Sequence, residues 1–468
     1  MRFSKEVVQK LKFPNNSILT KRRSLSLKPI FAVSLWLGLC LPLLQLNAAA
    51  QTHTETELGP DEAVRLALEN NLSLKKSQID IAASGYSEKR LWSEVFPSIS
   101  ASASAGYTNK LFGSMEPNNS GFRYSMGLGV NIGLNAGIPY SMKSIKLAHQ
   151  SNLLRYEDAC NQLSILITKR FYSLIAEKNN ILLLEEILNL AERQYERSNV
   201  SFRNGLTGEL SLIQSRLAVE NARYNLSAAG TSYANSMGEF LAMLGIASGS
   251  TITLLGEINI VRIEADAEAL IGRHLPGRPD IASNRREIER LEYAEKQSTL
   301  AGRAPSLNLS MEWRGTSFDP FTDSLSGTAS LNIPIDSWIP GTSKDQSFKR
   351  ANDSVERAKL DLSITEDAAK TQIRSLTALL HNSWDSIIIA RLSLEAARRG
   401  YELTEQGFRN GTVEYLTLED ARNNMANVRQ RLLQSELSYF NMILDLSAAL
   451  NVDWKNLIQT FGVSSEEK

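Results

Sequence analysis

Two long stretches of this chain carry the same hydrophobic pattern with a period of seven residues. The first stretch consists of Ile167, Leu174, Ile181, Leu188, Tyr195 and Phe202, and the second of Ile373, Leu380, Ile387, Leu394, Tyr401 and Phe408. The two series are identical position by position. A sustained period of seven is typical of α-helices that supercoil around one another, because a straight helix would rotate the stripe away from its partner. The chain therefore contains one long helical unit twice.

A chain reversal follows each stripe. The tetrapeptide Phe-Arg-Asn-Gly ends at Gly205 and again at Gly411, and both Asn and Gly tolerate the positive φ angles that tight turns require. Beyond the turns a second pair of stripes begins, formed by Leu212, Val219, Leu226, Tyr233 and Phe240 and by Leu418, Met425, Leu432, Tyr439 and Leu446. Each unit is predicted to be a long antiparallel helical hairpin with its tip at Asn-Gly.

A helix and two strands are predicted before the first hairpin. The amphipathic pattern of residues 58–96 indicates one helix, which Pro97 ends. Apolar residues then alternate with Ser, Gly and Asn over residues 98–110 and about 122–134. This period of two predicts two strands that pair as a β-hairpin.

The same series restarts in residues 278–342. A helix opens at Pro279 and ends at Pro305, and strands are predicted from Leu307 and from Leu325 through Ile335. The Gly/Ser-rich start of residues 247–269 indicates a linker between the two halves. Residues 51–468 are thus expected to form a single protomer of two structural repeats, about 58–246 and 270–452.

The first 50 residues have the features of an export signal. Lys21-Arg22-Arg23 precedes an apolar run from Ile30 to Leu46, and Ala48-Ala49-Ala50 supplies the small residues that signal peptidase requires. A retained membrane anchor is the alternative, although the apolar run is short for a membrane span. We expect a signal peptide over residues 1–50, cleaved after Ala50.

Charge argues against nucleic acid as a partner. The whole chain has 51 basic and 51 acidic residues, but residues 1–50 hold eight of the basic residues and one acid. The rest of the chain is therefore about seven charges negative. No basic patch typical of a nucleic-acid-binding protein is present in this sequence.

No pattern of catalytic residues stands out in the sequence. The histidines are scattered without the spacing of metal ligands, at positions 53, 149, 274 and 381. Cys160 lies on the first helical stripe, where a buried thiol acting as a small hydrophobe is the favoured interpretation. We predict that the protein is not an enzyme and has no cofactor or metal site.

The length of the four predicted strands is informative about where the protein resides, because strands of about ten residues are long enough to cross an outer membrane. An open sheet cannot lie in lipid with unpaired edges, and closed barrels begin at about eight strands. Several chains must then pool their strands, and three would give twelve strands and twelve helices, although counting alone also admits two or four chains. Aromatic residues near strand ends are candidates for an interfacial girdle but also suit ordinary strands: Tyr107, Phe112, Phe122, Trp313, Phe318, Phe321 and Trp338.

Together these features resemble the outer membrane efflux protein family, the TolC-like outer membrane factors. The resemblance covers most of residues 58–452 and includes the Phe-Arg-Asn-Gly tips, the Pro-Ser-Ile/Leu strand starts and the strand Leu331-Asn332-Ile333-Pro334-Ile335. It implies an α+β, mainly α fold of duplicated long helical hairpins and four transmembrane β-strands per chain. Three chains would form a 12-strand β-barrel in the outer membrane on a 12-helix α-barrel in the periplasm.

The same resemblance implies function and partners. The homotrimer would be a passive exit duct of a tripartite efflux or type I secretion system. Its partners would be a periplasmic adaptor (membrane fusion) protein, an inner-membrane transporter and outer-membrane lipid. The alternative is a periplasmic coiled-coil adaptor or scaffold, which would need no lipid-compatible strands.

Two candidate pore residues follow from the resemblance. In TolC-like tips a tyrosine and an arginine near the second turn and two aspartates beyond it close the pore, and here these positions hold Phe408, Val413, Thr417 and Asp420. Only Asp420 matches. Three copies of Asp420 facing the lumen would form an acidic ring that favours cations, whereas the alternative is a solvated helix residue. Thr417 and Asp420 are the candidate constriction.

The outer surfaces of the tips are the candidate docking sites for the adaptor. The residues concerned are Arg203, Asn204, Gly205 and Leu206 in the first hairpin and Arg409, Asn410, Gly411 and Thr412 in the second. Glycine at the apex would let a partner backbone approach closely. The simpler role of each glycine, making the turn, is sufficient by itself.

Overall fold

The computed structural model of the chain describes residues 56–108, 121–246, 252–316 and 322–463. Residues from Glu57 onward form one compact unit, to which the following description applies. The expected signal peptide lies outside the described residues. So do Phe112, Phe318 and Phe321 of the proposed aromatic girdle.

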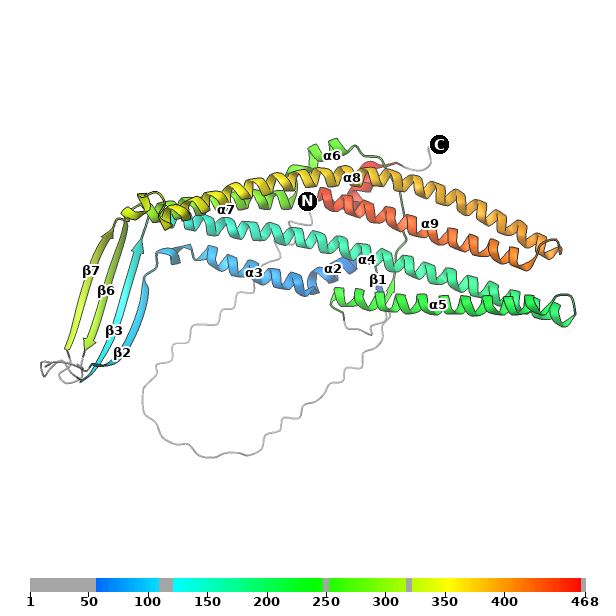
Figure 1. The fold of residues 1–468 in the computed structure, drawn as a ribbon, viewed down its shortest axis with the longest axis horizontal. Helices are drawn as coiled ribbons and strands as arrows, with labels where there is room; N and C mark the ends of the chain where they lie inside the picture. Colours follow the sequence, from blue (N-terminus) through cyan, green and yellow to red (C-terminus); the bar gives the residue numbers. More distant parts are fainter. Residues whose placement is uncertain (1–55, 109–120, 247–251, 317–321, 464–468) are drawn as a thin grey trace, which may run out of the picture. The chain divides into compact units, whose positions relative to one another are not determined.

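Two long helical hairpins make up most of the unit (Figure 1). The first consists of α4 (Ile138–Arg203) and α5 (Glu209–Leu244), and the second of α8 (Ser343–Arg409) and α9 (Tyr415–Leu450). The predicted hairpins and their tips are therefore confirmed. Helix α4 has 66 residues and is about 100 Å long at the usual rise per residue. In the described part of the chain, no helix combines the length and the apolar character that crossing a membrane would require.

The predicted stripes are best buried in the middle of the hairpins. Ile167 in α4 and Ile373 and Ile387 in α8 are fully buried, whereas Phe202 beside the first tip is 38% exposed. Three core clusters surround the buried parts of the stripes, a small one around Ala191 and Val219 and two larger ones. One of the larger clusters gathers side chains of α2 (Pro60–Asn70), α4, α5 and α9, including Phe171 and Phe440. The other gathers side chains of α6 (Ala267–His274), α8, α9 and α10 (Trp454–Phe461).

The single helix predicted over residues 58–96 is wrong. The chain instead forms α2 (Pro60–Asn70), α3 (Leu72–Lys89) and the short 3-10 helix η1 (Leu91–Val95). Asn71 causes the first break because its backbone is extended, while its side-chain oxygen accepts hydrogen bonds from the backbone N–H groups of Ser73 (2.9 Å) and Leu74 (3.2 Å). The prediction extended the amphipathic pattern of α2 across this cap, although α3 itself has little amphipathic character.

The second half opens with α7 (Pro279–Arg303), which begins at the predicted proline. The predicted linker is more structured than expected, since Tyr439 of α9 holds it in place. The Tyr439 hydroxyl donates to the carbonyl of Val261 (3.0 Å) and accepts from the N–H of Ile263 (2.9 Å). The smaller elements are β1 (Thr56–Leu58), β4 (Ile252–Leu254), β5 (Arg262–Ile263), α6 (Ala267–His274), η2 (Leu275–Gly277), α10 (Trp454–Phe461) and β8 (Gly462–Val463).

The four long strands form one antiparallel sheet in the order β2-β3-β6-β7. Their bounds are β2 (Ser98–Thr108), β3 (Gly121–Leu134), β6 (Ser306–Thr316) and β7 (Thr322–Asn332). Both predicted β-hairpins are confirmed, and the pairing of β3 with β6 joins the two halves. The last strand is shorter than predicted, because Ile335 already belongs to the 3-10 helix η3 (Ile335–Trp338).

The register of the sheet separates apolar from polar side chains. Leu128 of β3 lies opposite Ala101 of β2 and Trp313 of β6, and Trp313 in turn lies opposite Leu325 of β7. Since successive side chains of a strand alternate between faces, these apolar residues share one face. Serine, threonine, asparagine and most charged residues occupy the other face, but Asp323 lies on the apolar face, where it accepts a hydrogen bond from Trp313 Nε1 (3.3 Å). Leu325 is 69% exposed, so the apolar face has little cover within this chain.

Candidate functional site at the helical tips

Each hairpin tip is closed by the same hydrogen-bonded turn. After α4 the N–H of Gly205 donates to the carbonyl of Phe202 (2.9 Å), and the N–H of Leu206 donates to that of Ser201 (2.8 Å). This arrangement is a Schellman motif, which needs a left-handed residue just past the helix end. Gly205 provides it with φ of 70°, while Asn204 keeps φ of −86°. Of the predicted Asn-Gly pair, only the glycine uses its conformational freedom.

The second tip repeats this geometry. Gly411 has φ of 74°, and its N–H and that of Thr412 donate to the carbonyls of Phe408 and Gly407, each at 3.0 Å. Phe408 and Val413, which occupy the positions of the pore-closing tyrosine and arginine of TolC-like tips, pack against neighbouring residues of this tip. The Phe408 ring meets the Tyr415 ring edge-on, with centroids 6.3 Å apart, and Val413 lies so close to Gly407 that a Cβ atom there would be 2.7 Å from a Val413 methyl group.

All eight residues predicted to dock an adaptor are exposed at the two tips. Arg409 differs from the rest because it pairs with Glu405 on its own helix at 2.6 Å. Leu206 is 75% exposed and is available to a partner at the first tip. The docking role of all eight tip residues remains a prediction.

Thr417 and Asp420 are both exposed near the start of α9. They are three residues apart and therefore lie on the same side of the helix. Within the described part of the chain, Asp420 makes no hydrogen bond or ion pair. Its carboxylate is free for a pore-lining role, which remains a prediction.

A buried polar cluster lies on another side of α9 and was not predicted. The Tyr415 hydroxyl donates to Glu419 at 3.1 Å, and Arg422 forms an ion pair with the same carboxylate. Tyr415 is 8% and Arg422 6% exposed. Burial, and secondarily the charge of Glu419, raises the pKa of the Tyr415 phenol. The Nε atom of Arg422 is buried and has no hydrogen-bond partner among the described residues.

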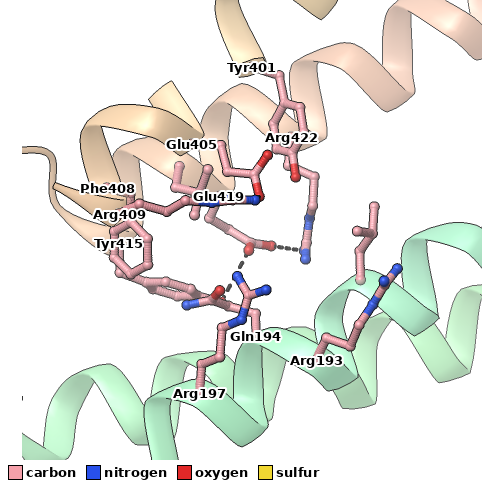
Figure 2. Close-up of a pocket in the computed structure, with 12 residues that line it drawn as sticks. Arg193, Gln194, Arg197, Tyr401, Glu405, Phe408, Arg409, Tyr415, Glu419 and Arg422 are labelled. Carbon is pink, nitrogen blue, oxygen red and sulfur yellow. Dashed lines mark hydrogen bonds and ion pairs between the residues drawn. The ribbon is translucent and has the colours of Figure 1, made fainter. Parts of the chain in front are cut away.

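This cluster borders a cavity of about 140 Å³ between the two hairpins. Figure 2 shows Arg193 and Arg197 rising from α4 toward the α9 cluster. Helix α8 adds further side chains to the wall, among them Tyr401 and Arg409. The cavity thus lies where side chains from both hairpins meet, a short distance from the tips.

The charges around the cavity do not balance. Its wall contains four arginines, Arg193, Arg197, Arg409 and Arg422, and two acids, Glu405 and Glu419. Both acids are already paired, with Arg409 and Arg422 respectively. Arg193 donates only to the backbone carbonyl of Asn189, and Arg197 makes no hydrogen bond or ion pair with any described residue. The cavity therefore has two uncompensated positive charges.

The spacing of Tyr415, Glu419 and Arg422 was a usable signal, since residues three and four apart face the same side of a helix. Comparison of the repeats strengthens it. The equivalent positions of α5 hold Glu209, Ile213 and Arg216, and Arg216 is exposed. The second hairpin has thus acquired a polar cluster that the first lacks.

The described residues offer no metal site, since no three His, Cys, Asp or Glu side chains among them come close enough to hold an ion. Cys160 is a free thiol and is only partly buried, less than predicted. Burial still raises the pKa of its thiol. It lies in the middle of α4, far along the helix from the tip.

Comparison with known proteins identifies the family. The sequence matches the outer membrane efflux protein family over residues 63–245 and 270–452. The chain belongs to this family. The predicted resemblance, the outer-membrane location and the function as an efflux channel are therefore confirmed, and the adaptor or scaffold alternative is not supported. The family consists of outer-membrane channels rather than enzymes.

Individual relatives agree with this assignment. The toluene efflux pump outer membrane protein TtgC of Pseudomonas putida is 23% identical over 409 residues, which are 84% of this chain and 83% of TtgC. The CmeC outer membrane channel of Campylobacter jejuni superposes with a TM-score of 0.69 at 18% identity, over 86% of this chain and 88% of CmeC. The open-state MtrE channel of Neisseria gonorrhoeae superposes with a TM-score of 0.67 at 14% identity, over 84% of this chain and 89% of MtrE. These structures share the fold of this efflux protein.

Proposed function

We propose that three copies of this efflux protein assemble into one channel, whose sheet forms a 12-strand barrel in the outer membrane and whose hairpins form a 12-helix tube in the periplasm. The observation that carries the proposal is the four-stranded sheet. Its outer strands β2 and β7 each have one neighbour among the described strands. In lipid the free edges would leave N–H and C=O groups unpaired. Joining β2 of one copy to β7 of the next removes every edge.

The chemistry of the two faces supports the same arrangement. A lipid-exposed barrel needs an apolar outer face and a polar lumen that alternate along each strand. The apolar face that includes Leu128, Trp313 and Leu325 meets the first requirement. The opposite face includes the ion pair of Glu312 with Arg314 at 2.7 Å, which suits a water-filled lumen.

The helical hairpins would extend the duct toward the inner membrane. Strand β3 ends at Leu134 and α4 begins at Ile138, so the tip of the first hairpin lies at the end of α4 remote from the sheet. The tips are therefore the part that an adaptor protein and a transporter would meet. Conduction through the tube is passive, and the partner transporter supplies the energy. Residues 1–50 would serve as the cleaved signal peptide, and residues 58–246 and 270–452 as two repeats of one protomer.

The test compares the two faces of one strand. Met311 lies mid-strand on the apolar face of β6, and Ser310 beside it points to the polar face. A lysine on the lipid face near the membrane centre costs about 2–4 kcal/mol, whereas a lysine in the lumen is tolerated. Met311→Lys should therefore reduce the trimer recovered from outer membranes in detergent, and Ser310→Lys should not.

Mass and conductance complete the test. Light scattering of the detergent-solubilised wild-type protein should give three chains per particle, and planar bilayers should show discrete channels. A strictly monomeric particle without conductance would overturn the proposal. Equal recovery of the two lysine variants would overturn the placement of the sheet in lipid.

A further inference from the structure

The cavity between the hairpins is lined by hydrogen-bond donors that lack acceptors. Arg422 is more than nine-tenths buried and borders the cavity, and its Nε has no partner among the described residues. Leaving a buried donor without an acceptor is unfavourable, because the group loses its hydrogen bonds to water and gains none in return. Such an atom in a native site therefore requires an explanation, and an unseen acceptor supplies one.

Further donors converge on the same space from the other two helices. Arg197 of α4 makes no hydrogen bond or ion pair within the described chain, and the hydroxyl of Tyr401 on α8 makes no hydrogen bond there. Burial, and secondarily Glu405, raises the pKa of the Tyr401 phenol, while the charges of Arg422, Arg409 and Arg193 oppose that rise. The phenol therefore stays protonated and able to donate at physiological pH. The arginines that act on it are those of the cavity wall.

We propose that this cavity is a binding site for a small oxyanion of the phosphate class. The donor set of Arg197, Tyr401 and Arg422 complements a ligand that offers several hydrogen-bond acceptors. The two uncompensated charges of the wall match a phosphate, which carries between one and two negative charges near neutral pH. Guanidinium groups bind such ligands through planar, paired N–H···O contacts. A spherical halide accepts these paired contacts less well.

The position of the site gives the ligand a structural role. Arg197 belongs to the first hairpin, whereas Tyr401 and Arg422 belong to the second. A bound oxyanion would accept hydrogen bonds from both hairpins. It therefore ties the two hairpins together close to their tips, in addition to the ion pair of Arg429 in α9 with Glu186 in α4 (2.9 Å).

Isothermal titration of the detergent-solubilised full-length protein with inorganic phosphate, at constant ionic strength, tests the site. We expect saturable binding of one phosphate per chain. Arg197→Gln, a change at an exposed position, should weaken binding at least tenfold. Arg422→Lys should do the same, because lysine keeps a positive charge beside Glu419 but loses the planar fork. Arg216→Gln is the matched control, since Arg216 is the exposed counterpart of Arg422 in the first repeat, and it should bind as the wild type does.

The titration can also contradict the site. Absence of saturable binding would overturn the proposal, as would unchanged affinity in Arg197→Gln. Displacement of phosphate by an equal concentration of chloride would show a general attraction for anions and would equally overturn it. Binding is measured on the solubilised chain whatever its oligomeric state, so the result is independent of the proposed trimeric channel.

Discussion

Gly205 and Gly411 adopt the same left-handed backbone conformation, with φ of 70° and 74°, at equivalent places in the two repeats. Both stand in open space, since an added Cβ atom would meet no other atom within 4 Å. A side chain would therefore fit at either tip. Its cost would come from the backbone alone.

Gly411→Ala should destabilise the second hairpin by about 1–2 kcal/mol, because the left-handed conformation is less favourable by this free energy for L-residues than for glycine. Thermal unfolding followed by circular dichroism measures the loss. Gly230→Ala is the control, since Gly230 also has open space but lies inside α5 without a positive φ. Equal melting temperatures for the two variants would contradict the strain assigned to Gly411.

Arg422→Ala should destabilise the tip by about 3 kcal/mol, because removing one partner of a buried ion pair leaves the other charge uncompensated. Here the remaining charge is Glu419, which is mostly buried beside Tyr415. Hydrogen exchange of the first turns of α9 should accelerate. Arg216→Ala removes the exposed counterpart in α5 and should stay within about 0.5 kcal/mol of the wild type. A similar response of both variants would count against the cluster.

The sequence carried enough information for the hairpins but not for the cavity. Residues such as Ile167 and Ile373 recur with a strict period, and a period directly reports which face of a helix is buried. The placement of Arg197 and the Tyr415 cluster on one cavity wall has no period, because it brings together residues of different hairpins. It depends on how α4 and α9 lie against each other, which only the three-dimensional structure gives.

Local chemistry also limited the prediction of the first helix. Asparagine is compatible with a helix interior, a cap or a turn, so the residue type at Asn71 does not by itself predict a break. Its capping of α3 is decided by the packing of α2 into the core, where Ala63 and Ala67 are fully buried. Tertiary contacts thus determined a break that the pattern leaves open.

Acid should weaken the ion pair of Glu287 and Arg290 in α7. The hydrogen bond from Arg290 lowers the pKa of the Glu287 carboxyl below its usual 4.5. A carboxyl with a lowered pKa in the folded protein adds stability that is complete above its unfolded pKa and is lost as the pH falls through its folded pKa. The pair therefore contributes fully above about pH 4.5 and progressively less below it.

Glu287→Gln should accordingly lower stability by about 0.5–1 kcal/mol at pH 6 and by less at pH 3, since such pairs are partly screened by solvent. Urea unfolding at the two pH values measures both quantities. Glu289→Gln breaks the more exposed pair with Arg286, whose side chains are each 46% exposed, and serves as the control. A Glu287→Gln effect that is the same at both pH values would be inconsistent with the lowered pKa.

Gly137→Ala tests how closely α4 and α7 approach. A Cβ atom at Gly137 would lie 2.7 Å from the carbonyl oxygen of Gln297 and 2.9 Å from the Ala301 Cβ. Separating the helices to admit it should cost about 1–3 kcal/mol in the free energy of unfolding. Gly400 lies at an exposed position of α8, where an added Cβ atom would meet no atom within 4 Å. Gly400→Ala should therefore stabilise the folded protein by about 0.5–1 kcal/mol. Stabilisation by both variants would refute the close approach.

Asp420→Ala tests the predicted constriction through conductance rather than stability. If three Asp420 carboxylates ring the pore, their removal should lower the preference for cations and weaken block by divalent cations in planar bilayers, because the ring concentrates positive ions. Thr417→Asp should act in the opposite direction, since Thr417 lies one helical turn away on the same side of α9.

Glu209→Ala provides the matched control for Asp420. Glu209 is an exposed acid just beyond the first tip, in the hairpin that the constriction does not use. Its loss changes the net charge as Asp420→Ala does, but it should leave cation block unchanged. The same shift in both variants would reveal a general surface-charge effect, and no shift in either would remove Asp420 from the pore wall.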